Sequence, residues 1–195
     1  MQKKALFGPL RFVPLTPAAW PDLERLFGER GACGGCWCMS WRLPKAEFER
    51  QKGAGNKAAL RRIVGEGPPP GILAWSGSEL IGWCAVAPRE SYVRLAKSRV
   101  LGPVDNRPVW SISCLFVRKE FRRRGVSAQL LLAATELAAA HGAAIVEGYS
   151  VAPYTSNAPA AFLWTGTIAS FEAAGFVEVK RGSPSRPIFR RFTRS

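Results

Sequence analysis

Residues 109–127 read Val-Trp-Ser-Ile-Ser-Cys-Leu-Phe-Val-Arg-Lys-Glu-Phe-Arg-Arg-Arg-Gly-Val-Ser, and an Ala/Leu-rich run follows as far as His141. The first part is apolar, β-branched and aromatic, which predicts a strand over 109–117. The alanines and leucines predict a helix of about four turns. A strand therefore enters a helix through a short basic turn that holds one glycine, Gly125.

This turn has the properties of an anion-binding site. The first N–H groups of a helix and the positive end of its dipole point to the same place, which suits phosphate. Gly125 allows close approach of the backbone, Ser127 is small, and the preceding residues include five cations: Arg118, Lys119, Arg122, Arg123 and Arg124. The alternative is an ordinary turn glycine beside a solvated basic face.

Three segments resemble the GNAT superfamily of N-acetyltransferases. Residues 122–127, Arg-Arg-Arg-Gly-Val-Ser, are similar to its pyrophosphate loop, Gln/Arg-x-x-Gly-x-Gly/Ala, with serine in the last position. Residues 143–149 resemble its fifth strand, and residues 171–176, Phe-Glu-Ala-Ala-Gly-Phe, resemble a segment near its C-terminus. The runs Cys-Trp-Cys-Met at 36–39 and Gly-Trp-Cys-Ala-Val-Ala-Pro-Arg-Glu at 82–90 resemble one subgroup. The resemblance covers residues 60–195 well and the first 60 in outline.

The resemblance implies an α/β protein with the GNAT fold, a mixed, twisted central sheet of six or seven strands with helices on both faces. It also implies a single acyl-CoA N-acyltransferase domain over residues 1–195. The expected reaction moves an acetyl group from acetyl-CoA, a co-substrate, to a primary amine of a small-molecule or peptide acceptor by direct attack in a ternary complex.

The resemblance further implies which residues bind the co-substrate. The backbone of the central strand would hold the pantetheine arm and polarise the thioester carbonyl, and the basic loop would bind the pyrophosphate. The expected cofactor-binding residues are Leu115, Phe116, Val117, Arg122, Arg123, Arg124, Gly125, Val126 and Ser127.

The acid and base of the reaction are less clearly marked. Phe171 stands where many family members have a tyrosine that protonates the departing thiolate, and phenylalanine cannot donate a proton. Tyr149 and Tyr154 are the substitutes considered, with packing or hydrogen bonding as the alternative for each. Glu147 is the candidate base, because a carboxylate in an apolar strand needs a reason. Its alternative is an ion pair with an arginine.

Residues 31–42 combine sulfur and indole side chains without a clean period. In the family this region covers the acceptor, so Trp37, Met39, Trp41 and Arg42 are expected to line an aromatic pocket with a cation at its edge. Cys33, Cys36 and Cys38 also suggest a zinc or iron–sulfur site, but three thiols do not complete a tetrahedron. We expect no metal. Cys114 is interpreted as a small buried hydrophobe rather than an acetyl-accepting nucleophile.

Composition limits the class of protein. The chain has 195 residues, 47% of them hydrophobic and 22% charged, which indicates a globular domain. No membrane span or signal peptide is evident, so we expect a cytoplasmic protein. The five cysteines, an odd number, are expected to be reduced thiols rather than a disulfide framework.

The formal net charge of +14 is larger than binding of coenzyme A would require. It suits an acidic acceptor, a nucleic-acid surface or simply a basic proteome. The alternative function is therefore a basic binding module for RNA or an acidic partner, with acyl-CoA as a regulatory ligand only. Nucleic acid is not the favoured partner, and pairing of C-terminal strands into a homodimer is left open.

Several other elements can be predicted from local patterns. The expected helices begin at Pro17, at Lys45 and at a cap on Asn56, and a partly helical segment covers 158–174. The expected strands cover 10–14, 72–75, 80–86, 146–149, 176–180 and 187–192, and a long connection covers 87–108.

Overall fold

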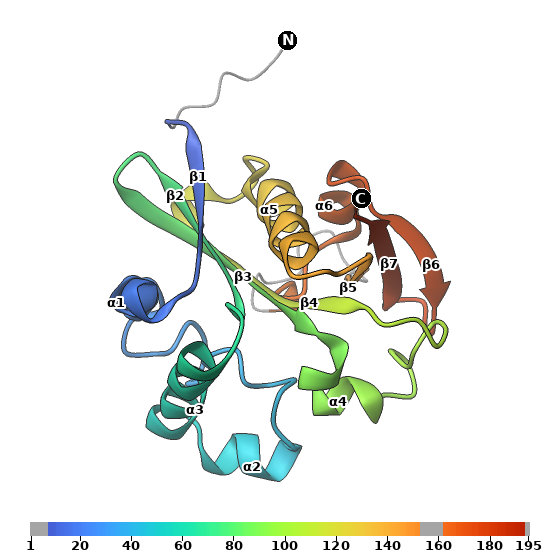
Figure 1. The fold of residues 1–195 in the computed structure, drawn as a ribbon, viewed down its shortest axis with the longest axis horizontal. Helices are drawn as coiled ribbons and strands as arrows, with labels where there is room; N and C mark the ends of the chain where they lie inside the picture. The colour runs from blue at the N-terminus through green and yellow to red at the C-terminus, as the bar shows by residue number, and fades with distance from the viewer. Residues whose placement is uncertain (1–7, 153–161, 194–195) are drawn as a thin grey trace.

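The computed structural model describes residues 8–152 and 162–193. In this part of the chain seven strands form one sheet in the order β1-β2-β3-β4-β5-β7-β6 (Figure 1). The strands are β1 (Leu10–Pro14), β2 (Gly71–Ser76), β3 (Glu79–Pro88), β4 (Trp110–Val117), β5 (Ile145–Tyr149), β6 (Val177–Arg181) and β7 (Pro187–Phe192). The pair β4 and β5 is parallel, and the other neighbours are antiparallel. The mixed sheet expected from the sequence is confirmed.

Helices cover both faces of this sheet (Figure 1). They are α1 (Trp20–Phe27), α2 (Lys45–Arg50), α3 (Ala54–Glu66), α4 (Val93–Ala96), α5 (Val126–Ala140) and α6 (Ile168–Ala173), with 3₁₀ turns at Pro17–Ala19, Arg89–Ser91 and Lys119–Phe121. One hydrophobic core lies between the sheet and α5 with α6, and a second lies between the sheet and α1 with α3. Among the described helices, none combines the length and apolarity that a bilayer span requires.

The strand over 109–117, the basic turn and the Ala/Leu-rich helix form as expected. Alanine and leucine make α5 apolar almost all round, and such a helix must be buried on most sides. Leu130, Leu131 and Ala134 are accordingly inaccessible to solvent between the sheet and neighbouring elements. Gly125 has φ +81° at the N-cap, a left-handed conformation that glycine adopts without strain.

The start of α3 differs from the expected one. Gly53, with φ +84°, is the N-cap, so Asn56 lies inside the helix. Asn56 is fully buried and its side-chain amide donates to the carbonyl oxygens of Gly35 (3.1 Å) and Phe48 (3.4 Å). The prediction that Asn56 caps the helix was wrong, because its side chain instead ties the loop at Gly35 to helix α2 at Phe48.

The C-terminal helix is shorter than the segment suggested for it. α6 begins at Ile168, where Thr167 and Ser170 form a capping box. Residues 153–161, which include Tyr154, lie outside the described residues.

The parallel strands β4 and β5 separate along their length. Only Trp110–Ile112 pairs with β5, and β4 continues beyond it to Val117. Beyond that point a segment before α6 takes the place of β5, because the Leu115 N–H donates to the Trp164 carbonyl oxygen at 2.7 Å. The same segment bonds to the end of β5 through the Val151 N–H and the Gly166 carbonyl, at 2.9 Å. The opening between the two strands holds the candidate site.

Candidate functional site

A cavity of about 1100 Å³ extends from the N-terminus of α5, along β4, to the segment before α2. Its described walls come from the loop into α5, β4, the cysteine-rich segment 32–40, Phe48 of α2, and residues 163–173 around the start of α6. Lys119, Arg122 and Arg123 are the charged side chains among these lining residues, and no described lining residue is Asp or Glu. The cavity is therefore electropositive at one end and uncharged elsewhere.

The electropositive end is the turn that the sequence singled out. Arg122, Arg123, Gly125, Val126 and Ser127 all line the cavity, whereas Arg124 is not among the lining residues. The leading N–H groups of α5 have no partner within the helix by geometry, and they face the same space. Charge and backbone donors thus converge where an anion would sit.

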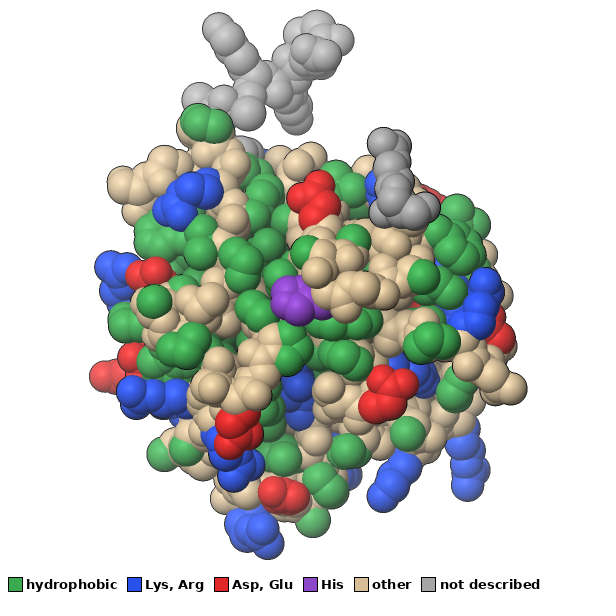
Figure 2. All heavy atoms as spheres, viewed as in Figure 1, with side chains coloured by type: hydrophobic (Ala, Val, Ile, Leu, Met, Phe, Trp, Pro, Cys, Tyr) green, Lys and Arg blue, Asp and Glu red, His purple; other side chains and the backbone are tan. Residues whose placement is uncertain are grey.

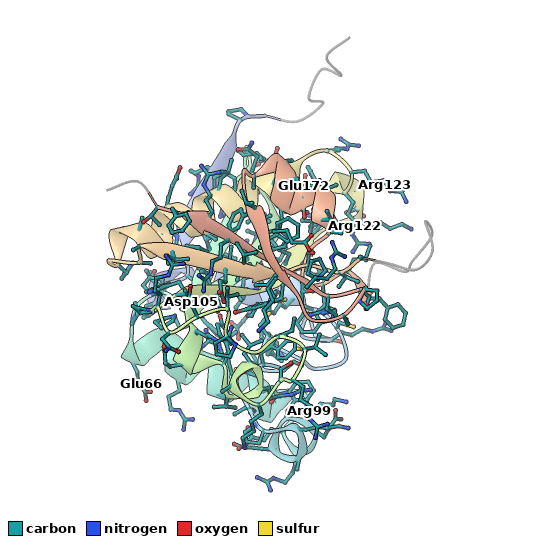
Figure 3. All side chains as sticks on the ribbon, turned by 90° about the vertical axis from the view of Figure 1, so that its right-hand side faces the viewer. Glu66, Arg99, Asp105, Arg122, Arg123 and Glu172 are labelled. Carbon is teal, nitrogen blue, oxygen red and sulfur yellow. The ribbon has the colours of Figure 1, made fainter. Side chains whose placement is uncertain are left out.

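Arg122 also holds the loop against the strand. Its Nε donates to the Val117 carbonyl oxygen at 2.9 Å. Arg123 has φ +58°, so the chain reverses sharply between this bond and the helix. Figure 3 shows Arg122 and Arg123 at the same end of the molecule as Glu172 of α6.

The backbone N–H and C=O groups of successive residues in β4 point to alternate sides of the strand, as in any strand. The Arg118 N–H donates to the Ile81 carbonyl on the β3 side, whereas the Leu115 N–H points the other way, to Trp164. The polar groups of Leu115 and Val117 therefore face the opening between β4 and β5. Leu115, Phe116 and Val117, the three predicted strand residues, line the cavity.

The far end of the cavity is rich in thiols. Cys33, Cys36, Cys38 and Cys114 line it, and the Cys38 Sγ lies 3.3 Å from the Cys114 Sγ. The Trp83 indole N–H donates to the Cys38 sulfur at 3.2 Å. Sequence patterns predicted the cysteine-rich segment but not its contact with Cys114, which is 76 residues away in the chain.

Two of these thiols, Cys36 and Cys114, are held in the protonated form. Burial raises the pKa of Cys36 to about 11, and the hydrogen bond from Cys38, together with burial, raises the pKa of Cys114 well above its ordinary value. Thiolates are the nucleophiles and metal ligands, so the neutral thiols favour a packing role. Within residues 8–152 and 162–193, no group of three or more His, Cys, Asp or Glu side chains is arranged to hold a metal ion.

The predicted acceptor residues are divided between the core and the rim of the cavity. Trp37 and Met39 are buried among α1, α3 and the sheet, and Trp37 stacks on Trp20 with ring centroids 6.0 Å apart. Trp41 packs at 6.0 Å against Trp164, which lines the cavity. Arg42 is buried against Tyr92, outside the lining.

Backbone conformation explains this division. Trp37 and Cys38 have φ values of +45° and +56°, so the segment is neither a regular helix nor a regular strand. Cys36, Cys38 and Ser40 line the cavity as a result, while their neighbours Trp37 and Met39 point into the core. Sequence alone contained no signal for this reversal.

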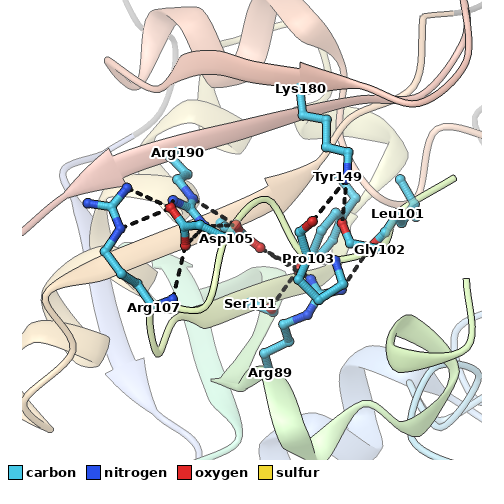
Figure 4. A network of polar contacts seen from close by, with 11 residues as sticks. Arg89, Leu101, Gly102, Pro103, Asp105, Arg107, Ser111, Tyr149, Lys180 and Arg190 are labelled. Carbon is cyan, nitrogen blue, oxygen red and sulfur yellow. Dashed lines mark hydrogen bonds and ion pairs between the residues drawn. The ribbon is translucent and has the colours of Figure 1, made fainter. Parts of the chain in front are cut away.

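Glu147 is not among the described lining residues and belongs to a buried polar network whose members Arg89, Tyr149 and Arg190 are labelled in Figure 4. The Arg190 Nε donates to its Oε1 at 2.7 Å, and Arg89 and the Tyr149 hydroxyl donate to its Oε2 at 3.2 and 3.0 Å. The carboxylate is 1% exposed. This arrangement favours the ion-pair alternative, and a catalytic role of Glu147 stays a prediction.

Tyr149 shares this network, and Asp105 extends it. The Tyr149 hydroxyl lies 2.7 Å from the Ser111 hydroxyl, and burial raises the pKa of Tyr149. The Asp105 carboxylate accepts from Arg190 at 2.6 Å, and Arg190 and then Arg107 hold the pKa of Asp105 well below its usual range. Tyr149 does not line the cavity, and its role as an acid stays a prediction.

Phe171 is a core residue. It is fully buried, stacks on Phe189 with ring centroids 5.5 Å apart, and meets Phe176 edge to face at 5.3 Å. A side chain at Gly148 would collide with the Phe171 ring. Phe171 therefore fills a tight apolar space.

Comparison with protein families gives one match. The model described as the acetyltransferase (GNAT) family matches residues 37–165. No curated protein matches the chain significantly in sequence.

Solved structures share the fold at low sequence identity. A GNAT-family acetyltransferase from Streptococcus agalactiae 2603 has a TM-score of 0.56 and 12% identity, over 98% of this chain and 100% of that chain. The PaiA N-acetyltransferase from Thermoplasma acidophilum, in complex with coenzyme A, has a TM-score of 0.53 and 13% identity, over 95% and 99%. The aminoglycoside N-acetyltransferase AAC(6')-Iy, in complex with CoA, has a TM-score of 0.52 and 20% identity, over 89% and 91%.

Proposed function

This chain belongs to the acetyltransferase (GNAT) family, and from that premise we propose that it transfers an acetyl group from acetyl-CoA to a primary amine of a small-molecule or peptide acceptor. The observation that carries the proposal is the continuous cavity. It joins a cationic helix N-terminus to an uncharged chamber across the opening between β4 and β5.

The cationic end suits the pyrophosphate of coenzyme A. Lys119, Arg122 and Arg123 surround the leading N–H groups of α5, and no carboxylate among the described lining residues opposes an anion. Two structures with the same fold were solved with coenzyme A bound, which supports this assignment.

The open edge of β4 suits the pantetheine arm and the thioester. Acetyl-CoA supplies an acyl carbon already activated toward an amine. The backbone N–H groups of Leu115 and Val117 would orient the amide and carbonyl oxygens beside them. The Leu115 N–H is bonded to the Trp164 carbonyl in this structure, so a ligand that used this donor would replace that bond.

Proton transfer needs few protein groups in this proposal. No Asp, Glu, His or Tyr is among the described lining residues. A thiol with a pKa of about 8.5 is a fair leaving group, so the departing thiolate does not require a protein acid. Direct attack by a neutral amine is compatible with such a chamber. Glu147, Tyr149 and Tyr154 remain candidates for proton removal and donation.

Calorimetric titration of acetyl-CoA into wild type, Gly125→Ala and Gly125→Glu tests the binding step. A Cβ at position 125 meets no atom within 4 Å, so either side chain has room, but both adopt a strained φ of +81°. The alanine variant therefore reproduces the strain without the charge. We expect Gly125→Glu to lose at least about tenfold in affinity relative to Gly125→Ala, because its carboxylate would face the pyrophosphate.

Equal affinities in these two variants would contradict the placement of pyrophosphate at this loop. Wild type that binds no acetyl-CoA would remove the proposed enzyme and leave the basic binding module. The face in Figure 2 does not favour that module, because Lys and Arg side chains lie mainly toward its margins. Nucleic-acid binding with a steep salt dependence would be its signature.

A further inference from the structure

Arg42 is a buried cation without a carboxylate partner in the described structure. It is 9% exposed, lies 4.6 Å from the centre of the Tyr92 ring and donates to the Tyr92 hydroxyl at 3.4 Å. Every Asp and Glu of the chain lies within the described residues, and none of the ion pairs there includes Arg42.

Arg94 is partly exposed and, like Arg42, takes part in none of the ion pairs of the described residues. Its Nη1 donates to the Ser40 carbonyl at 2.7 Å and lies 3.2 Å from the Ser40 hydroxyl, and its guanidinium lies 5.4 Å from the Trp41 ring centre. The Trp41 indole nitrogen is buried and has no hydrogen-bond acceptor among the described residues. Arg42 and Arg94 each offer a guanidinium, and Trp41 offers an indole N–H, so these three side chains present only hydrogen-bond donors.

The surroundings supply no hidden negative charge. Burial raises the pKa of Tyr92, the aromatic partner of Arg42, so its hydroxyl stays neutral. Burial likewise raises the pKa of Cys84, the thiol whose ionised form would interact electrostatically with Tyr92. Tyr92 and Cys84 are therefore neutral at physiological pH.

Desolvated cations without a counter-charge are unfavourable. Buried charges in proteins are normally paired, and an uncompensated one destabilises the fold by several kcal/mol. Arg190, buried to a similar degree, is paired with both Glu147 and Asp105. The missing partner of Arg42 and Arg94 is therefore best supplied by an anionic ligand.

The cluster adjoins the uncharged end of the cavity. Ser40, to which Arg94 bonds, lines the cavity, and Trp41 packs against the lining residue Trp164. The next residue, Thr165, accepts from the partly buried Arg186 at 3.4 Å. This is the acceptor side of the cavity, opposite the phosphate loop.

We propose that Arg42, Arg94 and the Trp41 indole N–H bind an anionic oxygen group carried by the acceptor, so that the acceptor is an acidic amine, with a carboxylate or phosphate, rather than a polyamine. The inference deepens the proposed function and rests on it for the identity of the ligand. Arginine's planar fork matches both of these oxygen groups.

Anion-dependent thermal unfolding tests the site directly. Wild type, Arg94→Gln and Arg99→Gln are melted in acetate, in phosphate and in chloride at equal ionic strength. Arg99 is exposed, belongs to the same connection and lies at the end of the molecule opposite Arg122 (Figure 3), so its variant loses the same charge elsewhere. We expect the stabilisation by acetate or phosphate over chloride to fall in Arg94→Gln and to persist in Arg99→Gln.

Equal stabilisation in wild type and Arg94→Gln, or equal losses in the two variants, would overturn the site. Arg42→Gln repeats the measurement on the more buried cation. Arg94→Gln, at a partly exposed position, keeps the test decisive if Arg42→Gln does not fold.

Turnover of matched amines then identifies the anion. The pairs are β-alanine with β-alaninamide, and O-phosphoethanolamine with ethanolamine. We expect wild type to prefer one acidic member by at least about tenfold in kcat/KM, and Arg94→Gln to lose most of this preference. Neutral amines used as well as acidic ones would contradict the inference.

Acetyl-CoA titration separates this failure from failure of the proposed function. Arg94→Gln is expected to bind acetyl-CoA like wild type, because Arg94 does not line the cavity. Wild type that binds acetyl-CoA but shows no anion effect at Arg94 would keep the enzyme and reject the acidic acceptor. Wild type with the anion effect but without acetyl-CoA binding would keep the site and reject the enzyme.

Discussion

Arg190 and Arg42 are both buried, at 3% and 9% exposure, but they are compensated in opposite ways. Arg190 contacts two carboxylates at 2.6–2.7 Å, whereas Arg42 contacts a neutral phenol. Arg190 and Glu147 occupy paired positions on neighbouring strands, so the register of β5 and β7 brings them together. The first arrangement is complete within the protein, and the second leaves a charge for a ligand.

The compensated network also anchors the long connection between β3 and β4. Asp105 from that connection accepts from Arg190, and Arg89 at its start donates to the Leu101 carbonyl at 2.7 Å (Figure 4). The connection is therefore fixed to the sheet by ion pairs. We infer that this network has a structural role, while the uncompensated cluster is available for binding.

The largest expected difference between the two clusters is in stability. Glu147→Gln leaves Arg190 and Arg89 without their shared carboxylate, and such a loss destabilises a protein by about 3–5 kcal/mol. Arg42→Met keeps most of the apolar volume and removes an uncompensated charge rather than an ion pair, so we expect no loss of stability, or a gain. Urea unfolding of both variants measures the free energies, and equal losses would contradict the comparison.

Turnover of Glu147→Gln tests the alternative role. A catalytic base predicts at least a roughly tenfold fall in turnover with unchanged acetyl-CoA affinity, at a temperature where the variant is folded. Retained turnover in the folded variant would leave Glu147 with the ion pair alone.

Acid should selectively destabilise the network of Arg190, Glu147 and Asp105. The pKa of Asp105 is lowered in the folded protein, chiefly by its hydrogen bond from Arg190, so folding favours the ionised form. This stability is present above the unfolded pKa of about 3.9 and is lost as the pH falls below it toward the folded pKa. Unfolding measured from pH 6 to about pH 2.5 should show a weaker acid dependence in Asp105→Asn. Identical slopes in wild type and variant would refute this contribution.

Hydroxyl removal should distinguish the two clusters on a smaller scale. The Tyr149 hydroxyl donates to Glu147 at 3.0 Å and lies 2.7 Å from Ser111, so Tyr149→Phe is expected to lose about 1–2 kcal/mol. The Tyr92 hydroxyl accepts from Arg42 only at 3.4 Å, so Tyr92→Phe should lose less than about 1 kcal/mol. Denaturant titrations compare the two, and the reverse order would contradict the geometry.

Thiol reactivity gives the smallest and most local test. Cys33 is exposed, whereas Cys84 is buried with a raised pKa, so iodoacetamide at neutral pH should modify Cys33 first and leave Cys84 unmodified in the native protein. Mass spectrometry of labelled peptides identifies the sites, and the unfolded protein is the control for access. Rapid labelling of native Cys84 would indicate a thiolate near Tyr92 and weaken the claim that Arg42 lacks a counter-charge.

Local patterns in the sequence determined most of the framework. The apolar run of β4, the basic turn with Gly125 and the Ala/Leu-rich α5 were predictable because propensity and period act over neighbouring residues. The cationic end of the cavity follows from the same stretch, since the N-terminus of a helix has free donors wherever it is placed.

Tertiary structure decided what the remaining side chains can do. Glu147 meets Arg190 only through strand register, and Cys38 meets Cys114 across 76 residues of chain. Arg42 packs against the neutral phenol of Tyr92 and not against a carboxylate, and no spacing in the chain encodes this contact across 50 residues. Charge compensation depends on every neighbour in space, so the division between structural and ligand-binding arginines emerges only in the folded protein.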